Sequence, residues 1–196
     1  MIDPYLDENT GALRNLLGAQ TVDELAHREA QVVFANEMSL SADSVPPTRD
    51  MREILLIHKK LFAGVYDWAG QVRTVDIKKN EAGAEFFLPV SKITTAFQYV
   101  TDELKRDSYL RSRDQQQFVE GLAAYYDKLN YIHPFREGNG RVQRIFWSRV
   151  AADAGYSIDW SRVVGNENNE ASRLAAETLD LSALKAMFER IVSAIL

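Results

Sequence analysis

The stretch from residue 133 to residue 144 is His133-Pro134-Phe135-Arg136-Glu137-Gly138-Asn139-Gly140-Arg141-Val142-Gln143-Arg144. Apolar residues follow it at helical spacing, among them Ile145, Phe146 and Val150. That pattern predicts a helix that begins at the glycine-containing turn and continues to about residue 155. The first N–H groups of a helix have no carbonyl partner, and the N-terminal end of a helix attracts anions. This segment therefore predicts a phosphate-binding turn joined to a helix.

The turn and two arginines after it have the chemistry of an anion site. Gly138-Asn139-Gly140 can aim successive backbone N–H groups into one concavity, and glycine allows a ligand to approach closely. Arg141 and Arg144 are three residues apart, so they share one face of the predicted helix. A planar guanidinium can donate two hydrogen bonds to a phosphate at once. Each piece alone is more often a plain turn or a solvated face, and their combination favours a site.

The residues before the turn add a base and a hard ligand. His133 can accept a proton at neutral pH, because an unperturbed imidazole has a pKa near 6.5. Glu137 offers carboxylate oxygens of the kind that hold Mg²⁺ together with substrate phosphates. Pro134 stiffens the loop, and Phe135 is expected to anchor it in the core. The segment thus predicts chemistry at a phosphate group with a general base beside it.

Composition limits the classes of function. The chain has 196 residues, with 46% hydrophobic and 26% charged residues and a net charge of −5. These values predict one globular domain over residues 1–196. An acidic chain without a basic tract is a poor candidate for direct nucleic-acid binding. The absence of cysteine excludes disulfides and thiolate metal sites, and no apolar run approaches the length of a membrane span. The N-terminal residues do not resemble a signal peptide, so we expect a cytoplasmic protein.

The rest of the sequence predicts a mainly helical protein with one small hairpin. The spacing of apolar residues predicts helices over 21–38, from an N-cap at Thr48 to about 62, and over 91–105, 113–131, 139–155, 166–177 and 182–195. Phe118, Leu122, Tyr125, Tyr126 and Leu129 mark the buried stripe of the helix before the signature segment. Residues 72–90 change character, with short β-prone runs on either side of a turn, and predict a hairpin whose Pro89 keeps it at an edge.

The segment 133–144 resembles the signature of the Fic family, His-x-Phe-x-Asp/Glu-Gly-Asn-Gly-Arg-x-x-Arg, at every specified position. Shorter similarities lie at Asp3-Pro4-Tyr5, Leu16-Leu17-Gly18, Leu61-Phe62, Trp68-Ala69-Gly70 with Arg73, and Ala171-Ser172-Arg173. The resemblance implies the Fic fold, a helical bundle with a short β-hairpin flap beside the active site, in agreement with the hairpin predicted over 72–90. It also implies transfer of AMP from ATP to a Tyr, Ser or Thr hydroxyl of a target protein.

The same resemblance assigns roles by position. His133 is implied to be the general base that deprotonates the attacking hydroxyl. Glu137 is implied to hold the Mg²⁺ that bridges the α- and β-phosphates, and residues 138–140 form the anion hole. Arg141 and Arg144 are implied to bind the β- and γ-phosphates of the ATP co-substrate.

Further residues are assigned to the nucleotide and the target. Arg136 belongs to the nucleotide site. The flap would pair with an extended segment of the target protein. Its turn, residues 78–83, is longer and more charged than the family's usual turn, and Lys79 is our preferred lysine for approaching the nucleotide. Asn169 or Glu170 lies where contacts to adenine are expected.

The resemblance also raises a question of regulation. Many Fic proteins carry an inhibitory Ser/Thr-x-x-x-Glu-Gly/Asn motif whose glutamate pairs with the second signature arginine. No glutamate followed by Gly or Asn in this chain has Ser or Thr four residues before it. Either the enzyme is unrestrained, or a separate antitoxin supplies a glutamate to Arg144. The second case implies a toxin–antitoxin pair, and single-domain members of that class modify type II topoisomerase subunits.

Other functions stay open. Kinase-type relatives have Lys where this chain has Gly140, which favours AMP transfer, although UMP or phosphocholine transfer would use the same scaffold. The chain could also be the Fic domain of a secreted effector that modifies host GTPases, in which case it is a fragment. A non-catalytic binding module is the third class, and the intact motif argues against it.

Overall fold

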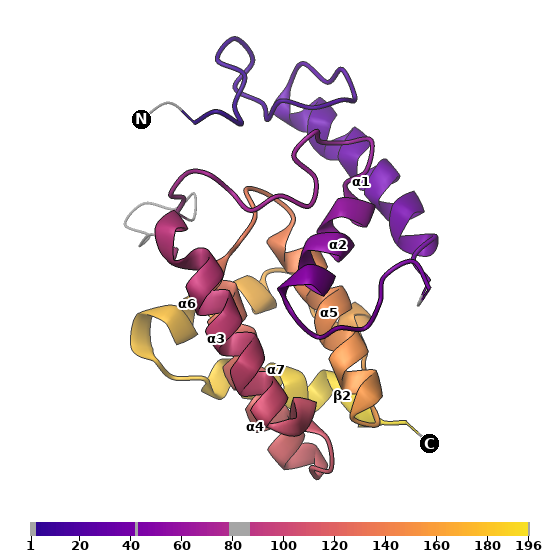
Figure 1. The fold of residues 1–196 in the computed structure, drawn as a ribbon, viewed down its shortest axis with the longest axis vertical. Coiled ribbons are helices and arrows are strands. Elements are labelled where there is room, and N and C mark those ends of the chain that lie inside the picture. The colour runs from indigo at the N-terminus through magenta and orange to yellow at the C-terminus, as the bar shows by residue number, and fades with distance from the viewer. Residues whose placement is uncertain (1–2, 42, 79–86, 196) are drawn as a thin grey trace.

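The computed structural model describes residues 3–41, 43–78 and 87–195, and the described chain is mainly helical. The α-helices are α1 (Val22–Met38), α2 (Met51–Leu61), α3 (Ile93–Arg106), α4 (Gln115–Ile132), α5 (Asn139–Asp153), α6 (Glu167–Thr178) and α7 (Ser182–Ile191). Three short 3-10 helices lie at Val90–Lys92, Ser108–Leu110 and Trp160–Arg162. The predicted mainly α fold is confirmed (Figure 1). None of the described helices is both long and apolar enough to cross a membrane.

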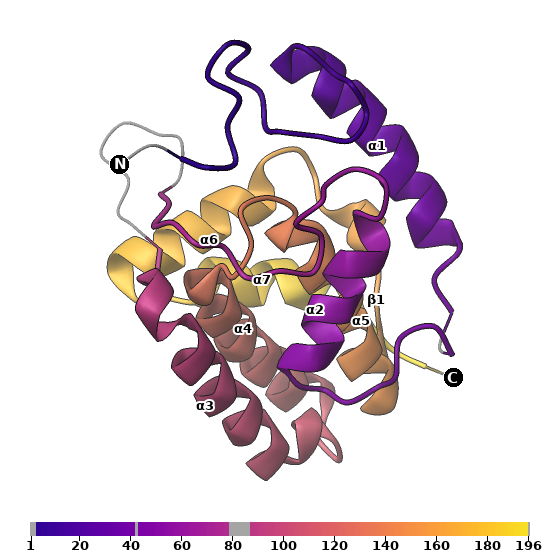
Figure 2. The same ribbon diagram turned by 45° about the horizontal axis from the view of Figure 1, so that its top comes forward.

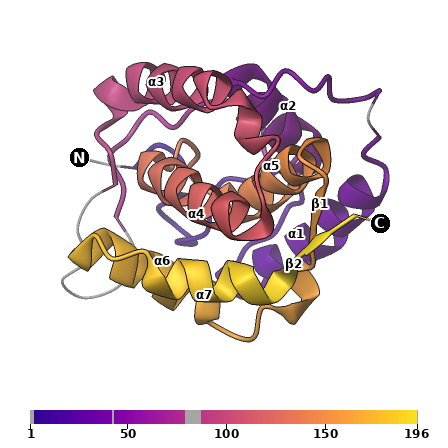
Figure 3. The same ribbon diagram turned by 90° about the horizontal axis from the view of Figure 1, so that it is seen from below.

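Helix α4 lies at the centre of the bundle. It contacts α3, α5, α6 and α7, and in a view from below these helices surround it (Figure 3). Its predicted stripe, from Phe118 to Leu129, is buried. A capping box starts the helix, because the Asp114 carboxylate accepts from the Gln117 N–H and the Gln117 side chain accepts from the Asp114 N–H. A central helix with a fixed start gives the loop after its C-terminus a defined place in the molecule.

Helices α1 and α2 pack on the side of α5. Helix α2 contacts both α5 and α1, and α1 lies on the outside of this layer (Figure 2). Thr21 caps α1 through its hydroxyl, which accepts from the Glu24 N–H. The predicted N-cap of α2 was wrong: Asp50, not Thr48, accepts from the N–H groups of Arg52 and Glu53. A carboxylate at this position satisfies two unpaired donors at once, and Thr48 supports it by donating its hydroxyl to Asp50.

A two-stranded antiparallel sheet closes the far end of α5. Its strands are β1 (Tyr156–Ile158) and β2 (Val192–Ala194), with Ser157 opposite Ser193. The helix predicted to reach Ile195 therefore ends at Ile191. The chain turns into a strand there because β1, which follows α5, provides backbone partners for its N–H and C=O groups. Neither strand was predicted, since three residues of a strand carry almost no periodic signal.

The predicted hairpin over 72–90 is described only at its base. Residues 79–86, which contain its tip and Lys79, lie outside the described residues. The two sides are joined where the Phe87 N–H donates to the Ile77 carbonyl at 3.0 Å. The second side also donates from the Leu88 N–H to the carbonyl of Tyr131 in α4. It ends early, because a 3-10 helix begins at Val90.

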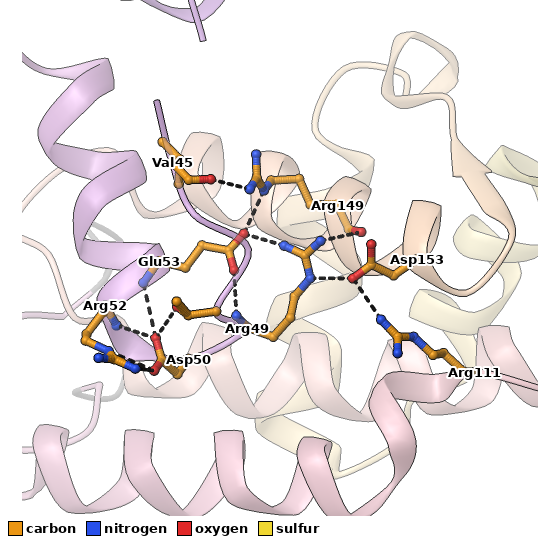
Figure 4. Close-up of polar contacts among 9 residues, drawn as sticks. Val45, Arg49, Asp50, Arg52, Glu53, Arg111, Arg149 and Asp153 are labelled. Atoms are coloured by element: carbon orange, nitrogen blue, oxygen red, sulfur yellow. Dashed lines mark hydrogen bonds and ion pairs between the residues drawn. The ribbon is translucent and has the colours of Figure 1, made fainter. Parts of the chain in front are cut away.

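A buried ion cluster joins the start of α2 to the end of α5 (Figure 4). The Glu53 carboxylate is completely buried and accepts from Arg49 and from Arg149, whose Nε lies 2.6 Å away. Arg49 also donates to Asp153 at 2.8 Å. Buried charges are tolerated only when they are paired and hydrogen-bonded, so each arginine here depends on its carboxylate.

We predict that Glu53→Gln lowers the free energy of unfolding by about 3–5 kcal/mol, because it removes the buried charge that pairs with both Arg49 and Arg149 and leaves Arg49 with Asp153 alone. Urea denaturation measures this change. The control is Glu177→Gln, which breaks an exposed pair with Arg173, and its expected cost is below about 1 kcal/mol. Equal losses in the two variants would show that the cluster does not hold α2 and α5 together.

Candidate active site

His133 stands at the end of α4 in a conformation that few residues adopt. Its backbone is left-handed, with φ 46° and ψ 64°, and its N–H donates to the Leu129 carbonyl. Pro134 follows, and a residue before proline is disfavoured in the right-handed helical region. The sequence therefore ends the helix at this position.

The imidazole of His133 is fixed in tautomer and in plane. Its Nδ1 lies 3.2 Å from the Asn130 carbonyl oxygen, which can only accept, so Nδ1 carries the proton. The ring stacks on Phe87, with centroids 3.7 Å apart and planes 12° apart. These two contacts make Nε2 the basic nitrogen. They also tie the catalytic candidate to the second side of the flap.

The turn after His133 is locked by a side chain within it. Asn139 is buried, its Oδ1 accepts from the Phe135 N–H at 2.9 Å, and its Nδ2 donates to the Phe135 carbonyl at 2.8 Å. Phe135 is itself buried, as predicted. The side-chain amide of Asn139 thus bonds to both backbone groups of Phe135, as a neighbouring β-strand would, and this closes the loop. Asn139 was assigned to the anion hole, and in the structure its side chain is used to hold the loop.

His58 of α2 holds the same turn from outside. It is fully buried, and its ring stacks on Phe135 at 3.9 Å. The Gly70 N–H donates to its Nδ1 at 2.7 Å, so its Nε2 donates to the Glu137 carbonyl at 3.1 Å. Burial, with a smaller contribution from the charge of Arg141, lowers the pKa of His58 to about 4. This histidine is a neutral bridge between α2 and the turn.

The two glycines of the turn have different surroundings. Gly138 has φ 82°, and a Cβ added there would lie 2.2 Å from the ring of Phe62. Only glycine fits, for conformation and for space. Gly140 is exposed, and a Cβ added there would meet no atom within 4 Å. The fold therefore does not demand glycine at position 140, and a side chain there would extend into open space.

Arg73 ties the loop to the flap. Its side chain is completely buried, and its guanidinium donates to the carbonyls of His133 at 2.8 Å and Val75 at 2.8 Å, and also to that of Leu88. Its backbone N–H donates to the Pro134 carbonyl at 2.8 Å. One side chain thereby joins both sides of the hairpin base to the start of the signature loop.

A cavity of about 1020 Å³ opens in front of these elements. Among the described residues, its lining includes four of the predicted site residues, namely His133, Arg136, Glu137 and Gly140. Asp3, Lys78 and Phe87 lie at its edge toward the N-terminus and the flap, and Asn168, Asn169 and Ser172 of α6 line another part. The N-terminus of α5 thus faces a space large enough for a nucleotide.

Glu137 is a partly exposed carboxylate that lines the cavity beside the turn. Its side chain is 43% exposed, and its Oε1 accepts from the Gly138 N–H at 2.8 Å and from Arg141 at 3.1 Å. The described residues contain no cluster of three or more metal-binding side chains. Mg²⁺ fits such a site, because it is commonly held by one or two carboxylates together with substrate phosphates and waters.

The three predicted arginines have different surroundings. Arg141 is half-buried, pairs with Glu29 and Glu137, and lies with its guanidinium 4.8 Å from the centroid of Phe62. Arg144 is exposed and lies 5.6 Å from the centroid of Trp160. Arg136 pairs with Asp3 at 2.8 Å. Only Arg136 of these three is among the described residues that line the cavity.

At the part of the cavity lined by α6, the structure favours Asn169 over Glu170, which is not among the described lining residues. The neighbouring Asn168, which we did not predict, also lines the cavity, and its Oδ1 accepts from the buried Tyr126 hydroxyl at 2.9 Å. Two amides at one part of a cavity are suited to the polar edge of a nucleobase.

Sequence reasoning also missed Glu29 and Tyr66. Glu29 lies on the buried stripe of α1 with Leu25 and Val33, and both Glu29 and Tyr66 line the cavity. The signal was present, since a carboxylate on the apolar stripe of a helix requires a partner. The partner, Arg141, is 112 positions away along the chain, so the sequence alone did not identify it.

Comparisons with known proteins show the family to which this chain belongs. The model of the Fic/DOC family matches residues 49–151, which is more than half of the chain. Protein adenylyltransferase VbhT of Bartonella schoenbuchensis is 39% identical over 170 residues, covering 87% of this chain and 35% of VbhT, so the chain spans about a third of that relative. Probable protein adenylyltransferase Fic of Salmonella typhimurium is 33% identical over 191 residues, covering 97% of this chain and 92% of the relative.

Solved structures with a similar fold include nucleotide complexes. The BepC protein of Bartonella tribocorum, a VirB-translocated effector with bound AMPPNP, superposes with a TM-score of 0.89 at 25% identity and covers 98% of this chain and 97% of its own. The N-terminal Fic domain of a Bep effector from Bartonella quintana with bound ADP has a TM-score of 0.89 at 26% identity, with 97% and 95% coverage.

We predict a pH dependence of stability from His58. Its folded pKa of about 4 lies below the unfolded value near 6.5, so only the unfolded chain takes up a proton between these values. Stability contributed by His58 is complete above pH 6.5 and falls by up to about 1.4 kcal/mol per unit as the pH drops toward 4. The measurement is the difference in free energy of unfolding between the wild type and His58→Gln, at pH 7 and pH 5. The difference shrinks at pH 5, whereas a constant difference would mean that His58 is not buried in its neutral form.

Proposed function

Because this chain belongs to the Fic/DOC family and is a protein adenylyltransferase, we propose that it moves AMP from ATP to a Tyr, Ser or Thr hydroxyl of a target protein with His133 as the general base. The observation that carries this proposal is the single cavity shared by His133, Glu137 and Gly140 at the N-terminus of α5. We treat residues 1–196 as one Fic domain.

The reaction follows from this arrangement. The oxygen of the target hydroxyl attacks the α-phosphorus, the bond from that phosphorus to the bridging oxygen of the β-phosphate breaks, and pyrophosphate leaves. The proton of the hydroxyl passes to Nε2 of His133, which is the basic nitrogen because Nδ1 donates to Asn130. Such a displacement depends mainly on positioning and on neutralising charge. The rigid loop supplies the first requirement, and the end of α5 supplies part of the second.

The phosphates are proposed to lie against the start of α5. The first-turn N–H groups at Gly140 and Arg141 have no carbonyl partner within the helix, and Gly140 lines the cavity. Arg141 and Arg144 are proposed to contact the β- and γ-phosphates. Glu137 is the residue proposed to hold Mg²⁺, which when bound neutralises phosphate charge. The nucleobase is proposed to face Asn168 and Asn169.

The target protein is proposed to dock on the flap. The ring of Phe87 stacks on the ring of His133, so a target segment bound along the flap is held close to the base. Pairing through the backbone aligns a hydroxyl without much dependence on side-chain sequence. Lys79 is proposed to approach the nucleotide from the flap. A cytoplasmic location, where ATP is available, belongs to the same proposal.

A separate antitoxin is proposed to restrain the enzyme through Arg144. Two observations support this: the chain contains no inhibitory motif, and Arg144 is exposed beside Trp160. VbhT is the relative that suggests this class, and type II topoisomerase subunits are the target proposed with it. Arg144→Ala is expected to escape inhibition by the cognate antitoxin. If that variant is bound and inhibited like the wild type, the restraint does not act through Arg144.

Effector function is the second candidate, and a specific observation favours it. Several structural neighbours, including BepC, are translocated effectors of Bartonella. In that case the target would be a host protein such as a GTPase. UMP or phosphocholine transfer remains the alternative chemistry on the same scaffold, and Asn168 with Asn169 would then contact a different group.

The central prediction uses ATP carrying label on either the α- or the γ-phosphate. Incubation of the protein with Mg²⁺ and bacterial lysate is expected to leave the α-label, and not the γ-label, on protein. His133→Ala is expected to lower the rate by about 10²–10⁴-fold, the usual contribution of a general base. The matched control is His27→Ala, because His27 is exposed on α1 and contacts Gln31.

Retention of the γ-label without the α-label would contradict AMP transfer. Unchanged transfer by His133→Ala would remove His133 from the role of base while leaving the transferred group established.

A further inference from the structure

We propose that Glu29 is a positioning residue that holds Arg141 in the orientation required for the phosphates of the nucleotide. The proposal rests on the proposed function, in which Arg141 contacts the β-phosphate. Glu29 lies on α1, outside the matched family region 49–151, and reaches the site only through the fold. It would act through Arg141 and not by touching the nucleotide.

Glu29 is a buried carboxylate with both oxygens occupied. The residue as a whole is 7% exposed. One carboxylate oxygen accepts from Arg141 Nη2 at 2.5 Å, and the other accepts from the Tyr66 hydroxyl. A carboxylate in such a place is costly unless it is paired and hydrogen-bonded. Its fixed position is therefore part of the folded state, and it gives Arg141 a fixed counter-ion.

The Tyr66 hydroxyl is anchored in turn. Its ring stacks on Trp68, with centroids 4.1 Å apart and planes 18° apart, and the side chain is buried. Burial and the neighbouring Glu29 carboxylate raise the pKa of Tyr66, so the phenol keeps its proton and remains a donor. The anchor, the carboxylate and the arginine form a chain of contacts from the core to the first turn of α5.

Two carboxylates share one nitrogen of Arg141. Glu137 accepts from the same Nη2 at 3.1 Å, but its side chain is 43% exposed, compared with 10% for Glu29. If Glu137 turns to a bound cation, Glu29 still holds Arg141. If the charge of Glu29 is lost, Arg141 is left with Glu137 as its carboxylate partner. A pair of Arg141 with Glu137 alone would draw Arg141 away from the phosphate, and it would also draw Glu137 away from the cation.

Holding Nη2 from one side has a geometric consequence. None of the described residues accepts a hydrogen bond from the Nε or Nη1 of Arg141, so the N–H groups of these two nitrogens can each donate to a phosphate. A planar fork held at one corner is already oriented before the ligand arrives. Removing a negative charge alone would strengthen phosphate binding. Loss of orientation weakens it, so the two effects have opposite signs and can be separated by experiment.

The test compares ADP with AMP by calorimetry in the presence of Mg²⁺, because AMP lacks the β-phosphate. We expect Glu29→Gln to weaken ADP binding about tenfold, the size of one charge-assisted contact, and to leave AMP binding unchanged. Tyr66→Phe keeps the charge of Glu29 and removes its anchor, and its expected loss for ADP is smaller but in the same direction. A merely structural defect would weaken both ligands alike and would overturn the proposal.

The Arg141→Ala variant separates the proposal from the function on which it rests. Arg141→Ala is expected to lose the preference for ADP over AMP, and adding Glu29→Gln to it is expected to change nothing further. If Arg141→Ala keeps the preference, the phosphate role of Arg141 fails. If it loses the preference while Glu29→Gln binds ADP as well as or better than the wild type, the positioning role of Glu29 fails. If Glu29→Gln does not fold, the ratio of ADP affinity to AMP affinity in Tyr66→Phe decides instead. A lower ratio than in the wild type supports the positioning role, and an unchanged ratio overturns it.

Discussion

The buried guanidinium of Arg73 is the constraint on which the site depends. A charge in the core needs a complete set of acceptors, and Arg73 finds them in carbonyls of His133, Val75 and Leu88. Burial lowers its pKa, while Asp76 at 3.8 Å favours its charged form. Satisfying this one side chain brings the base of the flap and the start of the signature loop together. Because these two segments are held side by side, the ring of Phe87 can stack on the ring of His133.

Rigidity elsewhere in the loop comes from two neutral groups. His58 reaches in from α2, and Asn139 closes the loop on itself. Because neither group carries charge, they fix the backbone without competing with the arginines for phosphate. The charged residues that remain around the cavity are therefore available for a ligand or for one another, and the pairing of Arg141 with Glu29 and Glu137 is the result. The side chains that hold the loop in place are therefore different from those that are charged and can bind a ligand.

Local features of this protein were predictable from its sequence, and long-range partners were not. Helices α1, α4 and α5, the buried stripe of α4 and the helix start at the glycine turn follow from spacing and turn chemistry, which act over a few residues. The hydrogen bond from Arg141 to Glu29 spans 112 positions of the chain, so only the fold identifies it. Strands β1 and β2 are too short for a periodic pattern. Gly138 and Gly140 look alike in sequence, and only the structure distinguishes them, by the positive φ of Gly138 and by the ring of Phe62 beside it.

The central claim is that the start of α5 and the imidazole of His133 belong to one nucleotide site. A crystal structure of the protein with ADP and Mg²⁺ tests it most directly. The account predicts phosphate oxygens in hydrogen-bond contact with the N–H groups of Gly140 and Arg141, the base beside Asn168 and Asn169, and the α-phosphate on the side of His133. A diphosphate bound away from the N-terminus of α5, with this end of the helix in contact with solvent alone, would contradict the claim.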